Sequence, residues 1–222
     1  MTDWLSYLLY LGYPICKQFP ERSFFYEGYQ MPVEARDVGI FVGFLFTFLF
    51  IFSARLKLLI SRGSIRIVVL SSILMLPLMV DAGSSYLSLR QTSNEIRLIT
   101  GLLFGVGAGV IISGLERDLA MPLSNPFTIK HMSIVFIVIP LHPLIEWSST
   151  STLAGFVIFS LLSAAGYILL FFIAIRVLIL ESGVKLFNNW KTGWRLFFLT
   201  VGLESALFSV LSGLHYLGLM IT

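Results

Sequence analysis

Asp81 is a carboxylate inside a long apolar stretch, residues 67–89, that has no other charge. A charge in the middle of a bilayer costs at least about 2.5–3.5 kcal/mol, so such residues mark either a working site or an internal ion pair. The natural partners for an ion pair are Arg36 and Arg97. Both interpretations of Asp81 stay open at the level of sequence.

Further polar residues come just before two apolar stretches, where they would gather near one membrane face. Their carboxylates suit a cation, and their arginines suit an anion, because the planar guanidinium binds phosphate oxygens in pairs. Asp37, Asp81 or His142 could also supply acid–base chemistry. The predicted binding cluster consists of Arg22, Glu34, Arg36, Asp37, Asp81, Asn94 and Arg97.

Three residues in the second half of the chain are candidate metal ligands: His142, Glu146 and His215. Imidazole and carboxylate are common ligands of transition metals. The alternative is that each histidine is a hydrogen-bonded structural residue. Glu204, in the last apolar stretch, favours a protonated or hydrogen-bonded packing role. No cofactor is demanded by the sequence.

The composition indicates the class of fold that holds these polar residues in place. Hydrophobic residues make up 57% of the 222 and charged residues 12%, against about 25% charged in soluble domains. We therefore predict an all-α fold, a polytopic helix bundle in a lipid bilayer. The net charge of +3 is too small to indicate nucleic acid as a partner, and Cys16, the single cysteine, excludes an internal disulfide.

Six apolar stretches predict six transmembrane helices, since lipid leaves backbone groups no other partner. The fourth could begin at Pro126 with Asn125 as its cap. Residues 4–15 are too short to span and predict an interfacial helix that precedes a polar loop at 16–37, all within one membrane domain, 1–222. The predicted spans are 38–54, 67–89, 98–115, 127–145, 153–175 and 196–221.

Glycines recur at four-residue spacing in the first and third predicted helices. Small residues on one face let two membrane helices approach closely, so helix packing is favoured over a pore or groove. Before the third helix, Thr92 and Glu95 match a capping box, with Thr92 as the cap. The predicted packing glycines are Gly39, Gly43, Gly101, Gly105 and Gly109.

The distribution of basic residues predicts orientation. Ten of the fifteen Lys and Arg residues fall in the first, third and fifth connections between helices. Basic loops lie mostly on the cytoplasmic side of a membrane, so these three connections are predicted to be cytoplasmic. With six spans, both termini are then predicted on the outer side of the cell membrane. Asp81 then lies about 21 Å along its helix, near the outer face.

The polar segments resemble the DUF2085 family, prokaryotic membrane proteins of unknown function. The resemblance covers about residues 14–110 and rests on several short motifs. They are Glu21-Arg22-Ser23-Phe24, Ala35-Arg36, Asp81-Ala-Gly83, and Ser93-Asn94 followed by Arg97 and Thr100-Gly101.

Two departures from the family pattern bear on metal binding. The family has a histidine where this chain has Lys17, and paired cysteines where this chain has Glu34 and Asp37. The thiolate–imidazole site that the resemblance implies therefore does not carry over. The two carboxylates favour hard cations or basic partners instead.

Three functions remain. A binding, transport or accessory role with an outward-facing polar site ranks first, because no diagnostic catalytic motif is present and an enzyme is therefore less favoured. The alternatives are an enzyme acting on a lipid or lipid-linked phosphate, and a structural subunit of a membrane complex. The expected partners are the bilayer and either another membrane protein or a second copy of the chain.

Overall fold

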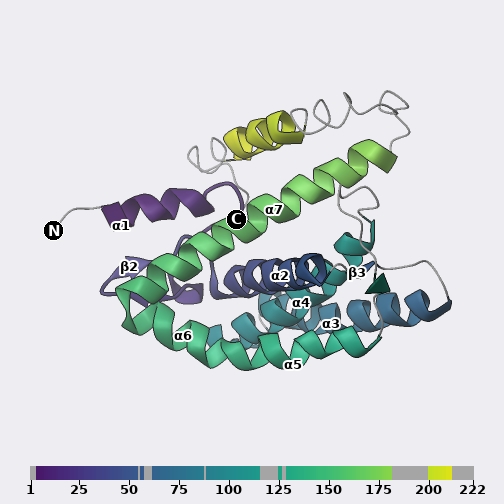
Figure 1. Ribbon diagram of the computed structural model, residues 1–222. Coiled ribbons are helices and arrows are strands. Elements are labelled where there is room, and N and C mark those ends of the chain that lie inside the picture. Colours follow the sequence, from purple (N-terminus) through teal and green to yellow (C-terminus); the bar gives the residue numbers. More distant parts are fainter. Residues whose placement is uncertain are drawn as a thin grey trace.

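The computed structural model describes residues 4–54, 56–57, 62–87, 89–115, 125–126, 129–181 and 200–211. Helices dominate this part of the chain (Figure 1). The labelled elements are α1 (Trp4–Tyr7), η1 (Leu8–Gly12), η2 (Pro20–Arg22), β1 (Phe25–Tyr26), β2 (Tyr29–Gln30), α2 (Ala35–Ser53), β3 (Leu56–Lys57), α3 (Arg62–Tyr86), α4 (Asn94–Leu115), β4 (Asn125–Pro126), η3 (Ile129–Ile134), α5 (Val135–Val138), η4 (Ile139–Leu141), α6 (His142–Ser151) and α7 (Leu153–Glu181).

Five helical segments of the described residues are long and apolar enough to cross a membrane. The chain is therefore an all-α membrane protein, as its composition predicts. The predicted sixth span, 196–221, is described only as the helix Thr200–Leu211. That length is well short of the roughly 20 residues needed to span. The five segments are Ala35–Ser53, Ile65–Ser85, Asn94–Ser113, His131–Ser151 and Leu153–Arg176.

Helices α2 and α4 form the centre of the bundle, with their backbones in close contact. A Cβ atom added at Gly43 would lie 2.7 Å from the Leu102 carbonyl oxygen, and one at Gly109 would lie 2.8 Å from the Thr47 Cβ. Added Cβ atoms at Gly39, Gly101 and Gly105 would likewise collide with backbone of the facing helix. The glycines thus permit an approach that no larger residue allows.

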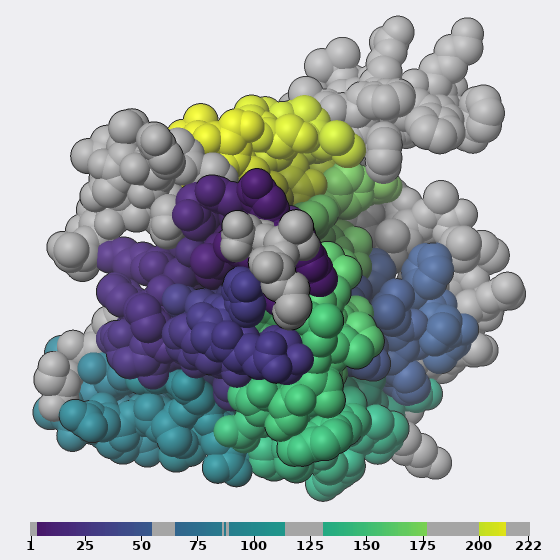
Figure 2. Space-filling model, turned by 90° about the vertical axis from the view of Figure 1, so that its left-hand side faces the viewer, coloured from purple at the N-terminus to yellow at the C-terminus, as the bar shows by residue number. Residues whose placement is uncertain are grey.

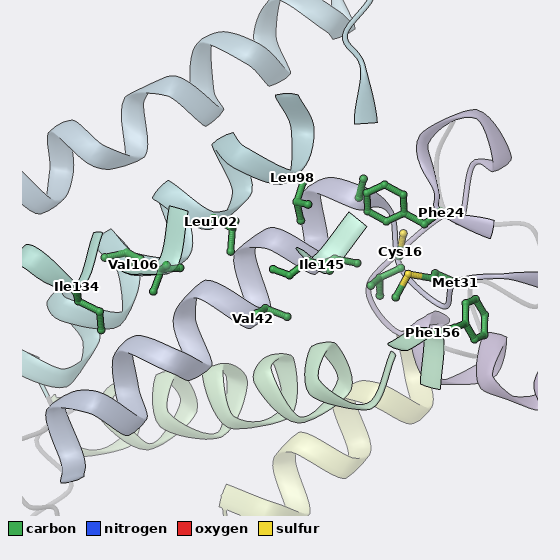
Figure 3. Packing of buried hydrophobic residues seen from close by; sticks show 14 of the residues in the cluster. Cys16, Phe24, Met31, Val42, Leu98, Leu102, Val106, Ile134, Ile145 and Phe156 are labelled. Atoms are coloured by element: carbon green, nitrogen blue, oxygen red, sulfur yellow. The ribbon is translucent and has the colours of Figure 1, made fainter. Parts of the chain in front are cut away.

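Fully buried aliphatic side chains fill the space beside this glycine contact. Val42 of α2 packs with Leu98, Leu102 and Val106 of α4, and Ile145 of α6 joins them (Figure 3). This core reaches the N-terminal segment. Leu5, Cys16 and Phe24 are buried together with Leu98 near the start of α4.

Helix α3 lies at the periphery, against α4 and η3. Ile65, Val69, Ile73, Met79 and Val80 are each at least half exposed. Large apolar side chains exposed along a spanning helix suit contact with lipid. One face of α3 therefore packs on protein, and the rest faces the bilayer.

The fourth predicted span, 127–145, is interrupted rather than continuous. The chain passes through η3, α5, η4 and α6, and it contains Pro140 and Pro143. Proline removes a backbone donor and clashes with the preceding turn, which breaks regular α-helix. Asn125 does not cap this span: Asn125 and Pro126 pair in parallel with Leu56 and Lys57.

The N-terminal segment covers one end of the bundle. Leu5 is buried, whereas Trp4, Tyr7 and Tyr10 are exposed. The Tyr167 hydroxyl of α7 donates to the Leu11 carbonyl at 2.6 Å. Figure 2 shows this segment in purple, below the helix Thr200–Leu211 in yellow. Residues 4–12 form two short helical elements, α1 and η1, and the interfacial position of residues 4–15 stays a prediction.

Candidate functional site

A network of amide hydrogen bonds fixes the loop that precedes α2. The Gln18 side chain donates to the Leu9 carbonyl at 2.6 Å and to the Pro32 carbonyl at 2.8 Å. The Gln30 side chain donates in turn to the Gln18 carbonyl at 2.7 Å. These bonds hold η2 over the ends of α2, α3 and α4, so the loop carries Glu21 and Arg22 to the site.

Asp81 occupies the centre of a three-residue ion cluster. It is 1% exposed. One carboxylate oxygen accepts from Arg36 Nη2 at 2.6 Å, and the other accepts from Arg90 Nη2 at 2.9 Å. Charge-assisted bonds to both oxygens offset the cost of burying the carboxylate. The predicted pairing of Asp81 with Arg36 is present in the structure, and the second partner is Arg90.

Arg97 is also buried, at 7% exposed, but its partners are neutral. Its Nη1 donates to the Asn94 side-chain oxygen at 3.0 Å and to the Glu21 carbonyl at 3.4 Å. Its Nε is buried with no hydrogen-bond acceptor. Within the described part of the chain, no carboxylate lies at ion-pair distance from Arg97, so the alternative Asp81–Arg97 pair does not form.

Asn94 links this arginine to the N-terminal loop. Its side-chain nitrogen donates to the Ser23 carbonyl at 3.2 Å. Ser23 in turn donates to the Phe19 carbonyl at 3.0 Å. Asn94 therefore positions Arg97 from one side and the loop from the other.

A polar cavity of about 470 Å³ lies beside these two clusters and is partly open to the outside. Three guanidinium groups line it against a single carboxylate, that of Glu21. Arg97 is repelled by the nearby Arg22 and Arg36 and attracted by the Glu34 and Asp81 carboxylates, none of which is at ion-pair distance from it. The chemistry of this wall favours an anion. The lining residues are Glu21, Arg22, Ser85, Arg90, Gln91, Thr92 and Arg97.

Thr92 does not cap α4. The helix begins at Asn94, and the Ser93 hydroxyl accepts from the Ile96 backbone N–H at 3.3 Å. Ser93 is therefore the capping residue, and the predicted capping box is wrong. Thr92 is buried, facing Asp81 and the cavity.

Glu34 and Asp37 do not line the arginine cavity, and both lie close to Cys16. The Phe19 backbone N–H donates to a Glu34 carboxylate oxygen at 3.4 Å, and the Cys16 thiol faces the Asp37 carboxylate. Cys16 is almost fully buried. Burial raises the pKa of the Cys16 thiol well above its usual range, and the negative charges of Asp37 and Glu34 raise it further.

The candidate metal ligands are not assembled in the described residues. His142 has its Nδ1 2.9 Å from the Ile139 carbonyl oxygen and its Nε2 3.4 Å from a Glu95 carboxylate oxygen. Glu146 lies one turn further along α6, and His215 falls outside the described residues. Across the described ranges, no group of three or more His, Cys, Asp or Glu side chains could hold a metal ion.

The comparisons with known proteins place this site in a family. Residues 16–111 match a family described as predicted membrane protein (DUF2085). An uncharacterised protein of Methanothermobacter thermautotrophicus is 31% identical over 103 residues, which cover 46% of this chain and 88% of that relative. The chain belongs to the DUF2085 family.

A second DUF2085-like relative is an uncharacterised protein of Methanocaldococcus jannaschii. It is 35% identical over 103 residues, which cover 46% of this chain and 64% of the relative, so this alignment spans just under two thirds of that protein. No solved structure matches the chain. The DUF2085 match includes every residue that lines the polar cavity.

Sequence reasoning missed Arg90 as a site residue. Arg90 follows α3 directly and folds back nine residues to reach Asp81. The available signal was an arginine just past the end of a helix whose last turns contain a buried carboxylate. The backbone carbonyl of Glu21 was also missed, since sequence carries no sign of which loop carbonyl meets Arg97.

Proposed function

We propose that this DUF2085 protein is a binding protein of the membrane, and that its polar cavity holds an anion of the phosphate class. The observation that carries the proposal is the buried Arg97 guanidinium, which has no carboxylate at ion-pair distance among the described residues. A second candidate function has no comparable support.

A buried charge without a counter-charge costs several kcal/mol. Asp81 has two guanidinium partners, whereas Arg97 donates to an amide oxygen and, at 3.4 Å, to a carbonyl. The Glu34 and Asp81 carboxylates attract Arg97 only from beyond ion-pair distance. An anion in the cavity would supply a counter-charge in direct contact with it. Phosphate suits it because several oxygens can accept from Arg22, Arg90 and Arg97 at once.

A cation fits the same place poorly. The Asp81 carboxylate is already bonded through both oxygens, and Glu34 and Asp37 do not line the cavity. Hydrolysis of a bound phosphate ester also has less support. The described lining residues include two hydroxyls, Ser85 and Thr92, but no histidine. The carboxylate that Thr92 faces, Asp81, is already bonded to two guanidinium groups and is therefore a poor base for activating a nucleophile.

We also propose that the cavity faces the outside of the cell membrane, with both termini on that side. The support is the excess of basic residues in the odd-numbered connections between spans. Cysteine-accessibility labelling in intact cells and in inverted vesicles tests this orientation, with Cys16 replaced by serine and one cysteine introduced at the N-terminus.

Thermal stability of the purified protein in detergent, with and without inorganic phosphate at constant ionic strength, tests the binding proposal. We expect phosphate to raise the melting temperature, since a ligand that binds only the folded state stabilises it. Arg97→Gln should abolish the increase. Arg66→Gln, an exposed arginine near the start of α3, is the matched control and should keep it.

An equal response of Arg97→Gln and Arg66→Gln would contradict the proposal, because phosphate would then act away from the cavity. Chloride at the same ionic strength separates a specific site from general screening. The proposal would also be contradicted if none of phosphate, arsenate and a phosphate monoester raised the melting temperature.

A further inference from the structure

A second hollow adjoins the polar cavity and differs from it in chemistry. It has a volume of about 530 Å³, is open on one side, and lies between α3 and α4. Apolar side chains dominate its wall. The lining residues are Ile73, Leu76, Pro77, Val80, Asp81, Arg90, Ile96 and Thr100.

Arg90 joins the two spaces, since it lines both the polar cavity and the apolar groove. Its side chain is half exposed, and within the described residues it has one hydrogen bond, from Nη2 to Asp81. A guanidinium has five N–H donors. Arg90 therefore keeps donors for a group that sits where the cavity meets the groove.

The groove follows α3 away from Arg90 and toward the middle of the span. Asp81 and Ile73 are eight residues apart, which is about 12 Å of helix. Beyond Ile73, α3 and α4 close up again: a Cβ atom added at Gly107 would lie 2.5 Å from the Ser71 carbonyl oxygen. The groove thus ends at a tight helix contact and opens sideways, toward the exposed face of α3.

Resting on the proposed anion site, we propose that the ligand is a membrane lipid that carries a phosphate group, with its headgroup in the arginine cavity and one apolar chain in the α3–α4 groove. The charge of the cavity selects the headgroup. The groove lies on the side of α3 that has mostly exposed apolar residues, as access from the bilayer requires. A free phosphate would occupy only the arginine cavity and leave the groove empty.

Three matched ligands separate the two halves of this site. Dioleoyl phosphatidic acid has both the phosphate and the chains, dioleoylglycerol has the same chains without phosphate, and glycerol 3-phosphate has the headgroup without chains. Native mass spectrometry of the full chain in detergent gives the bound fraction of each. We expect phosphatidic acid to bind at least tenfold more tightly than either of the others.

Substitutions in the groove and in the arginine cavity test the same ligands in a second way. Leu76→Trp fills the groove and should remove the preference for phosphatidic acid while glycerol 3-phosphate binding persists. Met79→Trp, an exposed position on α3 outside the groove, is its matched control and should change neither. Arg97→Gln should reduce binding of both phosphate ligands, and Arg90→Gln, at a half-exposed side chain, repeats that test if Arg97→Gln fails to fold.

The outcomes distinguish the two proposals. Equal binding of phosphatidic acid and glycerol 3-phosphate would overturn the lipid proposal and leave the anion site standing. Equal effects of Leu76→Trp and Met79→Trp on phosphatidic acid would overturn it as well. Binding of neither phosphate compound, or binding that Arg97→Gln and Arg90→Gln leave unchanged, would overturn both proposals.

Discussion

Asp81 and Arg97 are buried charges at the same end of the bundle, yet they are held in opposite ways. Asp81 has a guanidinium on each oxygen, from Arg36 and Arg90. Arg97 donates to an amide oxygen and a loop carbonyl, and within the described residues no carboxylate lies at ion-pair distance from it. A buried Nε without an acceptor is common to Arg36 and Arg97, so the two arrangements differ in their ion pairs. On our proposal, the paired charge holds helices together and the other one binds an anion.

The largest expected effect follows from breaking the complete cluster. Asp81→Ala leaves Arg36 buried without its counter-charge, which should lower the free energy of unfolding by about 3–5 kcal/mol. Reversible unfolding in mixed micelles measures the change. Glu27→Asn, at an exposed hairpin residue, should change it by less than about 0.5 kcal/mol. Comparable losses in the two variants would show that the Asp81 cluster is not structural.

The next effect comes from the helix contact that supports both charges. Gly105→Ile places a branched side chain against the α2 backbone at Ile40 and Phe44. We expect a loss of about 1–3 kcal/mol in unfolding free energy, the usual cost of overpacking. Gly83→Ala has open space around the added Cβ and should be neutral. The same unfolding assay compares them, and equal stability would mean that α2 and α4 separate readily.

Arg90→Gln tests the side chain shared by the two clusters. Because Arg90 is half exposed, we expect a stability loss of about 1 kcal/mol or less. Phosphate affinity should nevertheless fall by at least tenfold. Isothermal titration calorimetry gives the affinity, and a variant that loses stability but keeps full affinity would assign Arg90 to the structural cluster alone.

The smallest expected effect on stability comes from Arg97→Met. Arg97 has no carboxylate at ion-pair distance among the described residues. Replacing this buried cation by an apolar side chain of similar length should leave the ligand-free protein equally stable or more stable. The increase in melting temperature with phosphate should disappear. A marked loss of stability in the ligand-free variant would indicate that Arg97 already has a counter-charge in the folded protein.

The helices follow from sequence more directly than the site does. Lipid forces apolar segments into helices, so α2, α3, α4 and α7 overlap the predicted spans although their ends differ by several residues. The fourth span was predicted as continuous because apolar composition alone does not show where Pro140 and Pro143 interrupt it.

The site depends on contacts between residues far apart in the chain. Arg36 was a reasonable partner for Asp81 because a buried carboxylate needs a cation at the same depth, 45 residues away. Arg90 and the Glu21 carbonyl could not be found this way, since their positions depend on how two loops fold back. That no carboxylate of the described residues lies at ion-pair distance from Arg97 is likewise visible only in three dimensions.

Because Cys16 is buried, the rate at which its thiol is alkylated reports how often the N-terminal segment opens. Thiolate is the form that reacts with alkylating agents, and burial with a raised pKa makes the closed state inert. Because Cys16 is the single thiol, each alkylation event would report one opening of the N-terminal segment. If a bound anion fastens the loop through Arg22, it should lengthen the time between openings.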